Sequence, residues 1–332
     1  MIGQETREVE RKIAAILRVL SDSPEPLGGR VISRRLKAHG IDLGERAVRY
    51  HLKIMDERGL TRSIGYRDGR SITQPGLEEL RSALVCDKVG FVTDRLELLA
   101  YLTNFDLSGH TGYIPIDVSL FPKRDFPRAM EVMKSVFEAG LCASNLVAIA
   151  TEGERLGETM VPNGKIGFAT VCSAVVSGSM LKAGIPVDSR FGGILQIKHN
   201  EPMRFVELIE YNGSTIDPFE IFIAGRMTSA IKAAENGDGK ILASFQEIPL
   251  PSKAEANTVI EKLKAADLCN LAIMGKSSEQ VCEIPVRLNK VGLVLPSGLN
   301  AVAAAAETGI DATSKAMNGV IGVGELRSFW SL

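Results

Sequence analysis

The sequence has no arrangement of cysteine or histidine that would build a disulfide framework or a metal site. Its five cysteines are widely spaced, odd in number and without a Cys-x-x-Cys pair: Cys86, Cys142, Cys172, Cys269 and Cys282. Its four histidines, at positions 39, 51, 110 and 199, show no metal-ligand spacing. We therefore expect reduced thiols in a cytosolic protein, with no metal and no cofactor.

The sequence also lacks a segment typical of secretion or of a membrane span. The first dozen residues are heavily charged, which is not the pattern of a signal peptide. The most apolar stretch, around 291–306, is interrupted by Pro296, Gly298 and Asn300, so it does not predict a membrane helix. We expect a soluble, cytoplasmic protein that does not bind membranes.

Charge is not evenly distributed, although the net charge is only −1. Residues 1–82 carry 16 Lys and Arg against 12 Asp and Glu, whereas the remaining residues carry 23 against 28. A basic small domain beside an acidic larger one indicates that the first binds a polyanion, although a chance surface distribution gives the same totals.

Residues 1–82 show the pattern of a winged helix-turn-helix domain. Apolar residues at helical spacing predict a helix that Pro24 and Pro26 end, then a second helix closed by Gly40. A third helix is expected from about Glu45 to Arg58. Two β-prone runs, 61–64 and 70–73, flank an Asp-Gly pair and predict a hairpin, the wing.

The third helix has a basic outer face, which is typical of a helix that enters the major groove of DNA. Arginines in the wing would reach phosphates or the minor groove. The predicted DNA-binding residues are Arg46, Arg49, Tyr50 and Lys53 on the helix, and Arg62, Arg67 and Arg70 on the wing. The alternative is a winged helix that contacts protein or RNA.

Residues 83–111 are interpreted as a connector, and residues 112–332 as an α/β domain built by internal duplication. Segment 112–195 is similar to segment 240–321, with the same predicted order of strands and helices. The region between them is expected to hold a hairpin around Asn212-Gly213 and a helix from about Arg226.

Each half contains one junction where a strand leads into a helix of small residues. The first junction is Thr170-Val171-Cys172-Ser173 and the second is Pro296-Ser297-Gly298-Leu299-Asn300. Unpaired amides at such helix starts favour anions, including carboxylates, and Arg190 or Arg226 is a candidate cation. The predicted effector-binding residues are Thr170, Cys172, Ser173, Arg190, Ser297 and Asn300. Close helix packing is the alternative explanation of the small residues.

An enzyme is the less favoured interpretation of residues 112–332. Cys172 at a helix start would have a lowered pKa and could act as a nucleophile. However, neither repeat core contains a histidine, and Ser297 occupies the matching position of the second half. The sequence shows no paired carboxylates and no recognised phosphate loop. We therefore predict a regulator that is not an enzyme.

Several segments resemble known families. "ERAVRYHLKIMDERGL" resembles the recognition helix of bacterial and archaeal winged-helix repressors. "VGFVTDRLELLAYLTNFDLSGHTG", "VCSAVVSGSMLKAGIPVDSRFGGILQI" and "VGLVLPSGLNAV" resemble the nitrogen-responsive repressors of methanogenic archaea, whose regulatory domain also occurs in some bacteria. This likeness extends over essentially the whole chain.

The resemblance implies a dimeric repressor of nitrogen-assimilation and nitrogen-fixation genes that 2-oxoglutarate releases from DNA. Some family members carry two copies of the regulatory domain, and this chain has room for one. We expect a homodimer that binds a pseudo-palindromic operator in double-stranded DNA. A different effector metabolite, such as an amino acid or a nucleotide, is the main alternative.

Overall fold

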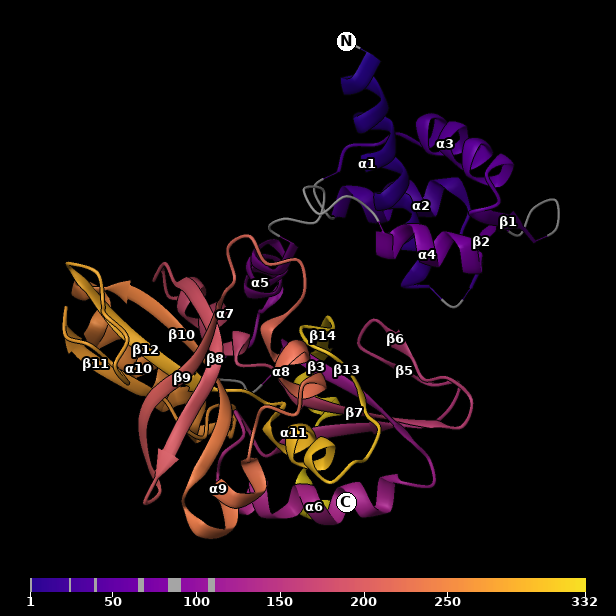
Figure 1. Ribbon diagram of the computed structural model, residues 1–332. Coiled ribbons are helices and arrows are strands. Elements are labelled where there is room, and N and C mark those ends of the chain that lie inside the picture. The colour runs from indigo at the N-terminus through magenta and orange to yellow at the C-terminus, as the bar shows by residue number, and fades with distance from the viewer. Residues whose placement is uncertain (1, 24, 39–40, 65–68, 83–90, 107–110) are drawn as a thin grey trace. The chain divides into compact units, whose positions relative to one another are not determined.

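The computed structural model describes residues 2–23, 25–38, 41–64, 69–82, 91–106 and 111–332 (Figure 1). The chain divides into two compact units, residues 1–88 and 89–332. Each unit has its own buried apolar core, and each is described by itself.

The first unit is a winged helix-turn-helix, as the sequence predicts. It contains α1 (Ile2–Ser21), α2 (Gly29–Ala38), α3 (Glu45–Glu57), β1 (Thr61–Ser63), β2 (Arg70–Ile72) and α4 (Gln74–Ser82). Leu17, Ile32, Val48 and Leu52 pack in one core, since their helical spacing places them on the inner faces of the three helices. β1 and β2 form the antiparallel wing, and residues 65–68 of the predicted turn between them lie outside the described residues.

The second unit begins with α5 (Phe91–Leu102), a helix within the segment interpreted as a connector. Residues 91–106 of that segment thus belong to the compact second unit. Val92 and Leu99 of α5 are buried there. The remainder of the segment includes 83–90 and 107–110, which are not described.

The two halves have the same order of elements up to their ends, where the first half has one long strand, β8, and the second has two short strands, β13 and β14. The first half contains β3 (Tyr113–Pro122), α6 (Phe126–Glu138), β4 (Leu146–Ala150), β7 (Lys165–Val171), α7 (Ala174–Lys182) and β8 (Asp188–Lys198). The second contains β10 (Gly239–Pro249), α10 (Lys253–Ala265), β11 (Ile273–Ser277), β12 (Lys290–Pro296), α11 (Asn300–Glu307), β13 (Thr313–Lys315) and β14 (Val320–Gly322). Smaller elements are β5 (Arg155–Leu156), β6 (Thr159–Met160), β9 (Glu201–Glu210), α8 (Pro218–Ala224), α9 (Ala230–Asn236) and β15 (Arg327–Ser328).

The halves exchange their last strands. The five-stranded sheet has the order β11-β12-β10-β8-β9, so β8 of the first half completes the sheet of the second. The six-stranded sheet has the order β13-β3-β7-β4-β15, and both β13 and β14 of the second half pair with β3. Because backbone groups in a buried strand must be paired, neither half can form its complete sheet without the other.

The helices also pair across the halves. α6 packs against α11, and α7 packs against α10 (Figure 1). Met133 and Phe137 share one core with the alanines of α11, while Val176 and Met180 share the other with α10. Both α7 and α11 are buried around most of their circumference, which requires small side chains.

The hairpin between the halves lies at a different place from the one expected. β8 and β9 are joined by His199 and Asn200, which have φ of 54° and 63°. Two successive residues in the left-handed region match a type I′ turn, which tolerates asparagine. Asn212-Gly213 instead forms a turn that precedes α8, and α9 begins at Ala230 rather than near Arg226.

The two junctions are in contact with each other. A Cβ atom added at Gly298 would lie 2.2 Å from the carbonyl oxygen of Val171 and 3.0 Å from Thr170 Oγ1. The second junction thus packs directly on the first, and a glycine is required where the backbones approach.

We predict that Gly298→Ala destabilises the second unit by at least about 1–3 kcal/mol, because the added methyl group meets a backbone oxygen that cannot move easily. Urea unfolding measures the change. Gly324→Ala is the matched control, since nothing lies within 4 Å of a Cβ added there. Equal stability of the two variants would show that the junctions are not in contact.

Candidate functional site

The predicted recognition residues lie together on the exposed face of α3. Arg46, Arg49, Tyr50 and Lys53 are all exposed, while Val48, Leu52 and Met55 are buried. Their spacing of three, four and seven residues places the four side chains on one side of the helix. Tyr50 is 63% exposed, so its ring and hydroxyl group are accessible on this face.

Acidic neighbours partly neutralise this face. Arg49 Nη2 lies 2.6 Å from Glu45 Oε1, and Lys53 Nζ lies 4.0 Å from Glu57 Oε1. Both are exposed pairs one helical turn apart, which contribute only about 0.3–0.5 kcal/mol. A phosphate or a base edge can therefore replace these carboxylates at small cost.

The predicted DNA-binding residues of the wing differ in how exposed they are and in what they contact. Arg62 is exposed on β1, as a phosphate-contacting residue must be. Arg70 is only half-exposed, and its Nε donates to Asp56 Oδ2 at 2.8 Å. Asp56 also accepts from Thr61 Oγ1 at 2.5 Å, so Arg70 helps to hold the wing against α3. Arg67 lies outside the described residues.

Of the residues at the first junction, Thr170 has the most unusual environment. Thr170, Cys172 and Ser173 are all buried, with 1%, 6% and 7% of their surface exposed. Thr170 Oγ1 has no hydrogen-bond partner among the described residues. Ser173 precedes α7 but its side chain does not cap the helix. The amides of Val175 and Val176 already donate to the carbonyl oxygens of Cys172 and Ser173, so the unpaired Thr170 hydroxyl group is the polar group at this junction that suits a small polar ligand.

The second junction uses its polar side chains for the fold. Asn300 Nδ2 donates to the carbonyl oxygens of Leu141 and Leu242, and its Oδ1 accepts from the amide of Leu242. Ser297 Oγ accepts from the amide of Leu299 at 3.1 Å. Since the Asn300 amide is occupied by backbone groups on both sides, a role in holding the junction replaces the predicted ligand contact.

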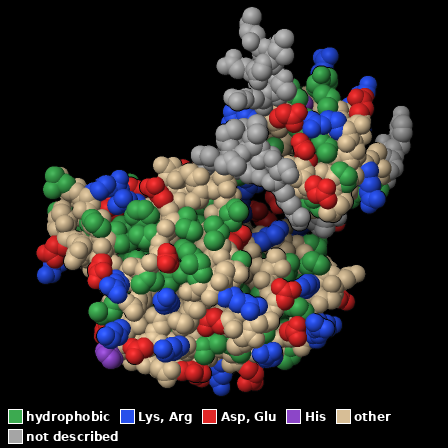
Figure 2. Space-filling view, in the orientation of Figure 1, with side chains coloured by type: hydrophobic (Ala, Val, Ile, Leu, Met, Phe, Trp, Pro, Cys, Tyr) green, Lys and Arg blue, Asp and Glu red, His purple; other side chains and the backbone are tan. Residues whose placement is uncertain are grey.

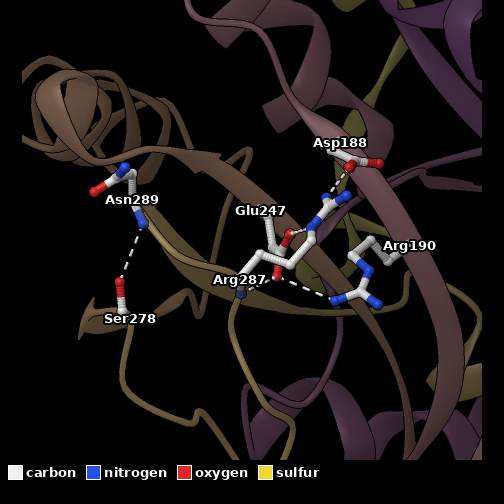
Figure 3. A network of polar contacts seen from close by, with 6 residues as sticks. All are labelled: Asp188, Arg190, Glu247, Ser278, Arg287 and Asn289. Atoms are coloured by element: carbon white, nitrogen blue, oxygen red, sulfur yellow. Dashed lines mark hydrogen bonds and ion pairs between the residues drawn. The ribbon is translucent and has the colours of Figure 1, made fainter.

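Arg190 is part of an ion-pair network and is not a free cation at the junctions (Figure 3). Its Nη1 lies 3.1 Å from Oε1 of Glu247, whose side chain is fully buried. Arg287 also donates to Glu247 and to Asp188. The Arg190 guanidinium therefore already pairs with a buried carboxylate, and its contact with the effector stays a prediction.

Buried acids that the sequence analysis missed surround the first junction. Asp117 on β3 pairs in register with Thr170, and its Oδ1 accepts from the amide of Met317 at 2.8 Å. Burial raises the pKa of Asp117 to about 6. Burial, together with the nearby Glu220, raises the pKa of Asp217 to about 8. The signal was present in the sequence, because Asp117 is the one charged residue in a largely apolar strand.

These acids also change the expected chemistry of Cys172. Burial, and then the charge of Asp117, raise the pKa of Cys172 well above its usual value. The expectation of a lowered pKa at the start of α7 was therefore wrong, since desolvation and a nearby carboxylate outweigh the helix dipole. A protonated, buried thiol is not a nucleophile.

Little open space is present at the junctions in this conformation. The hollow lined by Ala143, Ser173, Cys269 and Pro296 holds no volume that a water molecule could enter.

Among the described residues, no cluster of His, Cys, Asp and Glu is arranged to hold a metal ion. No described helix is both long and apolar enough to cross a membrane. Lys and Arg side chains are mixed with Asp and Glu on the face of the second unit seen in Figure 2.

Family models match both units of the chain. The model described as "NrpR regulatory domains NRD1 and 2" matches residues 89–328. The model described as "Ribonuclease R winged-helix domain" matches residues 14–80. The chain is also similar to a nitrogen repressor-like protein of known crystal structure from Methanococcus jannaschii, with a TM-score of 0.61 and 23% identity over 72% of this chain and 98% of that one. At that identity the likeness shows the fold.

Three curated relatives are similar over nearly all of this chain. The global nitrogen regulator NrpRI of Methanosarcina mazei is 40% identical over 92% of this chain and 93% of its own length. The global nitrogen regulators NrpR of Methanococcus maripaludis and Methanocaldococcus jannaschii are each 32% identical over 90% and 89% of this chain. The chain spans 51% of the length of each of those two.

We predict that Asp117→Asn stabilises the second unit more at pH 8 than at pH 5. The raised pKa of Asp117 means that its contribution to stability is full below pH 4 and is lost as pH rises through about 6. Asparagine still accepts from Met317 but carries no charge, so the gain should differ by about 1–2 kcal/mol between the two pH values. Urea unfolding at each pH measures it, with the exposed Asp311→Asn as control. A gain in stability that does not change with pH would contradict the raised pKa of Asp117.

Proposed function

This chain belongs to the NrpR family of nitrogen regulators, and we propose that it is a DNA-binding repressor of nitrogen-assimilation genes that a dicarboxylate effector, 2-oxoglutarate, releases from its operator. The observation that carries the DNA-binding part is the exposed face of α3, where Arg46, Arg49, Tyr50 and Lys53 lie together. A nitrogen-responsive transcriptional regulator agrees with the names of its relatives.

A homodimer would place two α3 helices in successive major grooves, with half-sites about one helical turn apart. Arg46, Arg49, Tyr50 and Lys53 then contact base edges or nearby phosphates, while Arg62 contacts the backbone. Arg49 would leave Glu45 for the DNA. Arg67 stays a proposed phosphate contact, and Arg70 acts by holding the wing in place through Asp56.

The effector is proposed to bind at the first junction. Support comes from the unpaired Thr170 Oγ1, with Cys172 and Ser173 beside it at the start of α7. Ser297 lies in the adjoining second junction, while Asn300 and Arg190 support the fold around the site. Because the hollow there is closed, effector binding requires an opening of this region.

The buried acids impose a condition on an anionic effector. Ionised Asp117 and Asp217 would repel a carboxylate, whereas their protonated forms could donate hydrogen bonds to it. Since burial raises the pKa of both acids, they take up protons close to neutral pH. Binding of 2-oxoglutarate at this junction therefore includes proton uptake.

We expect 2-oxoglutarate to bind more tightly at pH 6 than at pH 8, since the protonated acids favour the bound anion and lose their protons as pH rises. Calorimetry at the two pH values measures the dissociation constants, and Asp117→Asn should reduce the difference. An affinity that rises with pH, or the same pH dependence in the variant, would place the effector elsewhere.

The first experiment is a titration of 2-oxoglutarate into the complex of full-length protein and DNA from its own upstream region, at fixed salt. A coupling of ~1–3 kcal/mol predicts that DNA affinity falls roughly 5- to 150-fold at saturation. Specific DNA binding that does not respond would retain the repressor and reject this effector. A thermal-shift panel of amino acids and nucleotides would then identify another ligand, since saturation at 100 times Kd stabilises by about 2.7 kcal/mol.

The DNA contacts are tested by Arg46→Ala and Lys53→Ala. Loss of a base contact costs about 1–3 kcal/mol, and loss of a phosphate contact lowers the salt dependence of binding by about one charge. Fluorescence anisotropy with operator DNA at several salt concentrations distinguishes the two. The exposed Arg124→Ala in the second unit is the control. Unchanged DNA affinity in both variants would favour a winged helix that contacts protein.

A further inference from the structure

Helix α5 covers the side of the first junction. Val92 and Leu99 of α5 belong to the same buried apolar cluster as Cys172, Ala174 and Met317. Cys172 is part of the first junction and Ala174 is the first residue of α7. A change at the start of α7 therefore acts on side chains that α5 contacts directly.

The C-terminal end of α5 packs closely against α7. A Cβ atom added at Gly178 would lie 2.4 Å from Cβ of Thr103, which is fully buried directly after α5. Lys182 Nζ donates to the carbonyl oxygen of Tyr101 at 3.0 Å. Such close contact leaves little room for α7 to move without moving α5.

Arg95 connects the middle of α5 to the buried acid at the junction. Its side chain is only 16% exposed, and its Nη2 lies 2.8 Å from Glu158 Oε2. Its Nε donates to the carbonyl oxygen of Met317 at 2.8 Å. The amide of the same Met317 donates to Asp117 Oδ1. Hence Arg95 binds the carbonyl oxygen of Met317, and Asp117 binds the amide of the same residue.

Met317 has a backbone conformation that is sensitive to these contacts. Its φ is 53°, in the left-handed region, which a non-glycine residue adopts only when its surroundings hold it there. The hydrogen bonds from Arg95 and to Asp117 are two of the interactions that do so. Loss or change of either one favours a different conformation of this loop.

We infer that Arg95 is a positioning residue that couples the first junction, through Met317, to α5. The inference rests on the proposed effector site and names how that site is connected to the rest of the chain. In the sequence, α5 is the first described helix of the second unit and follows the winged-helix unit after residues 83–90. An effector that changes the Asp117–Met317 bond thus changes the position of the helix nearest in sequence to the DNA-binding unit.

The test uses full-length Arg95→Ala and compares two measurements. Calorimetry gives the dissociation constant for 2-oxoglutarate, and anisotropy gives the DNA affinity without effector and at saturation. We expect effector affinity and effector-free DNA affinity within about threefold of the wild type, while the 5- to 150-fold release expected for the wild type falls toward one. A residue with a purely structural role would not separate these quantities.

Arg95→Lys and Arg155→Ala complete the design. Lysine can still donate to the carbonyl oxygen of Met317 but forms fewer bonds, so it should restore part of the release even if the alanine variant folds poorly. Arg155 is exposed on β5, and its replacement should leave the release unchanged.

Three outcomes would overturn the inference. Full release in Arg95→Ala shows that α5 is positioned without Arg95. Weakened effector binding with normal release at saturation places Arg95 in the effector site itself. Failure of the wild type to bind 2-oxoglutarate rejects the proposed effector, and this inference with it. If the wild type binds 2-oxoglutarate normally, full release in Arg95→Ala rejects this inference alone.

Discussion

The exchange of final strands between the two halves is the constraint on which the regulatory unit depends. β8 pairs with β10, and β13 and β14 pair with β3, so each sheet is completed by the other half. All these pairs satisfy backbone groups that burial would otherwise leave unpaired, at a cost of about 1–3 kcal/mol each. The duplicated halves are therefore one folding unit, and their junctions are forced together.

The contact between the junctions explains the small residues that first suggested an anion site. Gly298 lies against Thr170 and Val171, and Gly178 lies against Thr103. Both glycines are needed for packing, which supports the alternative explanation of these segments. Packing and ligand binding remain compatible at the first junction, because Thr170 keeps an unpaired hydroxyl group there.

The buried acids of the second unit form two groups, which differ in whether arginine side chains neutralise them. Glu247 is fully buried but is neutralised by Arg190 and Arg287 in one network (Figure 3). Asp117 and Asp217 have backbone donors but no arginine partner among the described residues, so burial raises their pKa. The first group holds strands together, whereas the second responds to protons and to nearby anions.

The sequence by itself determined the winged helix, the α/β duplication and the basic face of α3. Helical spacing places Arg46 and Lys53 outside and Val48 and Leu52 inside, a local property that needs no knowledge of distant residues. The order of strands and helices in each half was visible in the same way. The family resemblance of the quoted segments agrees with the matched family model.

Only the tertiary structure decided which polar groups are free. Glu247 meets Arg190 across a distance of 57 residues in the chain, and Met317 meets Asp117 across 200. Asn300 binds the backbone of Leu141 in the first half and of Leu242 in β10, and burial together with Asp117 raises the pKa of the Cys172 thiol. Such pairings depend on strand exchange and burial between remote segments, and local patterns of side chains carry no information about them.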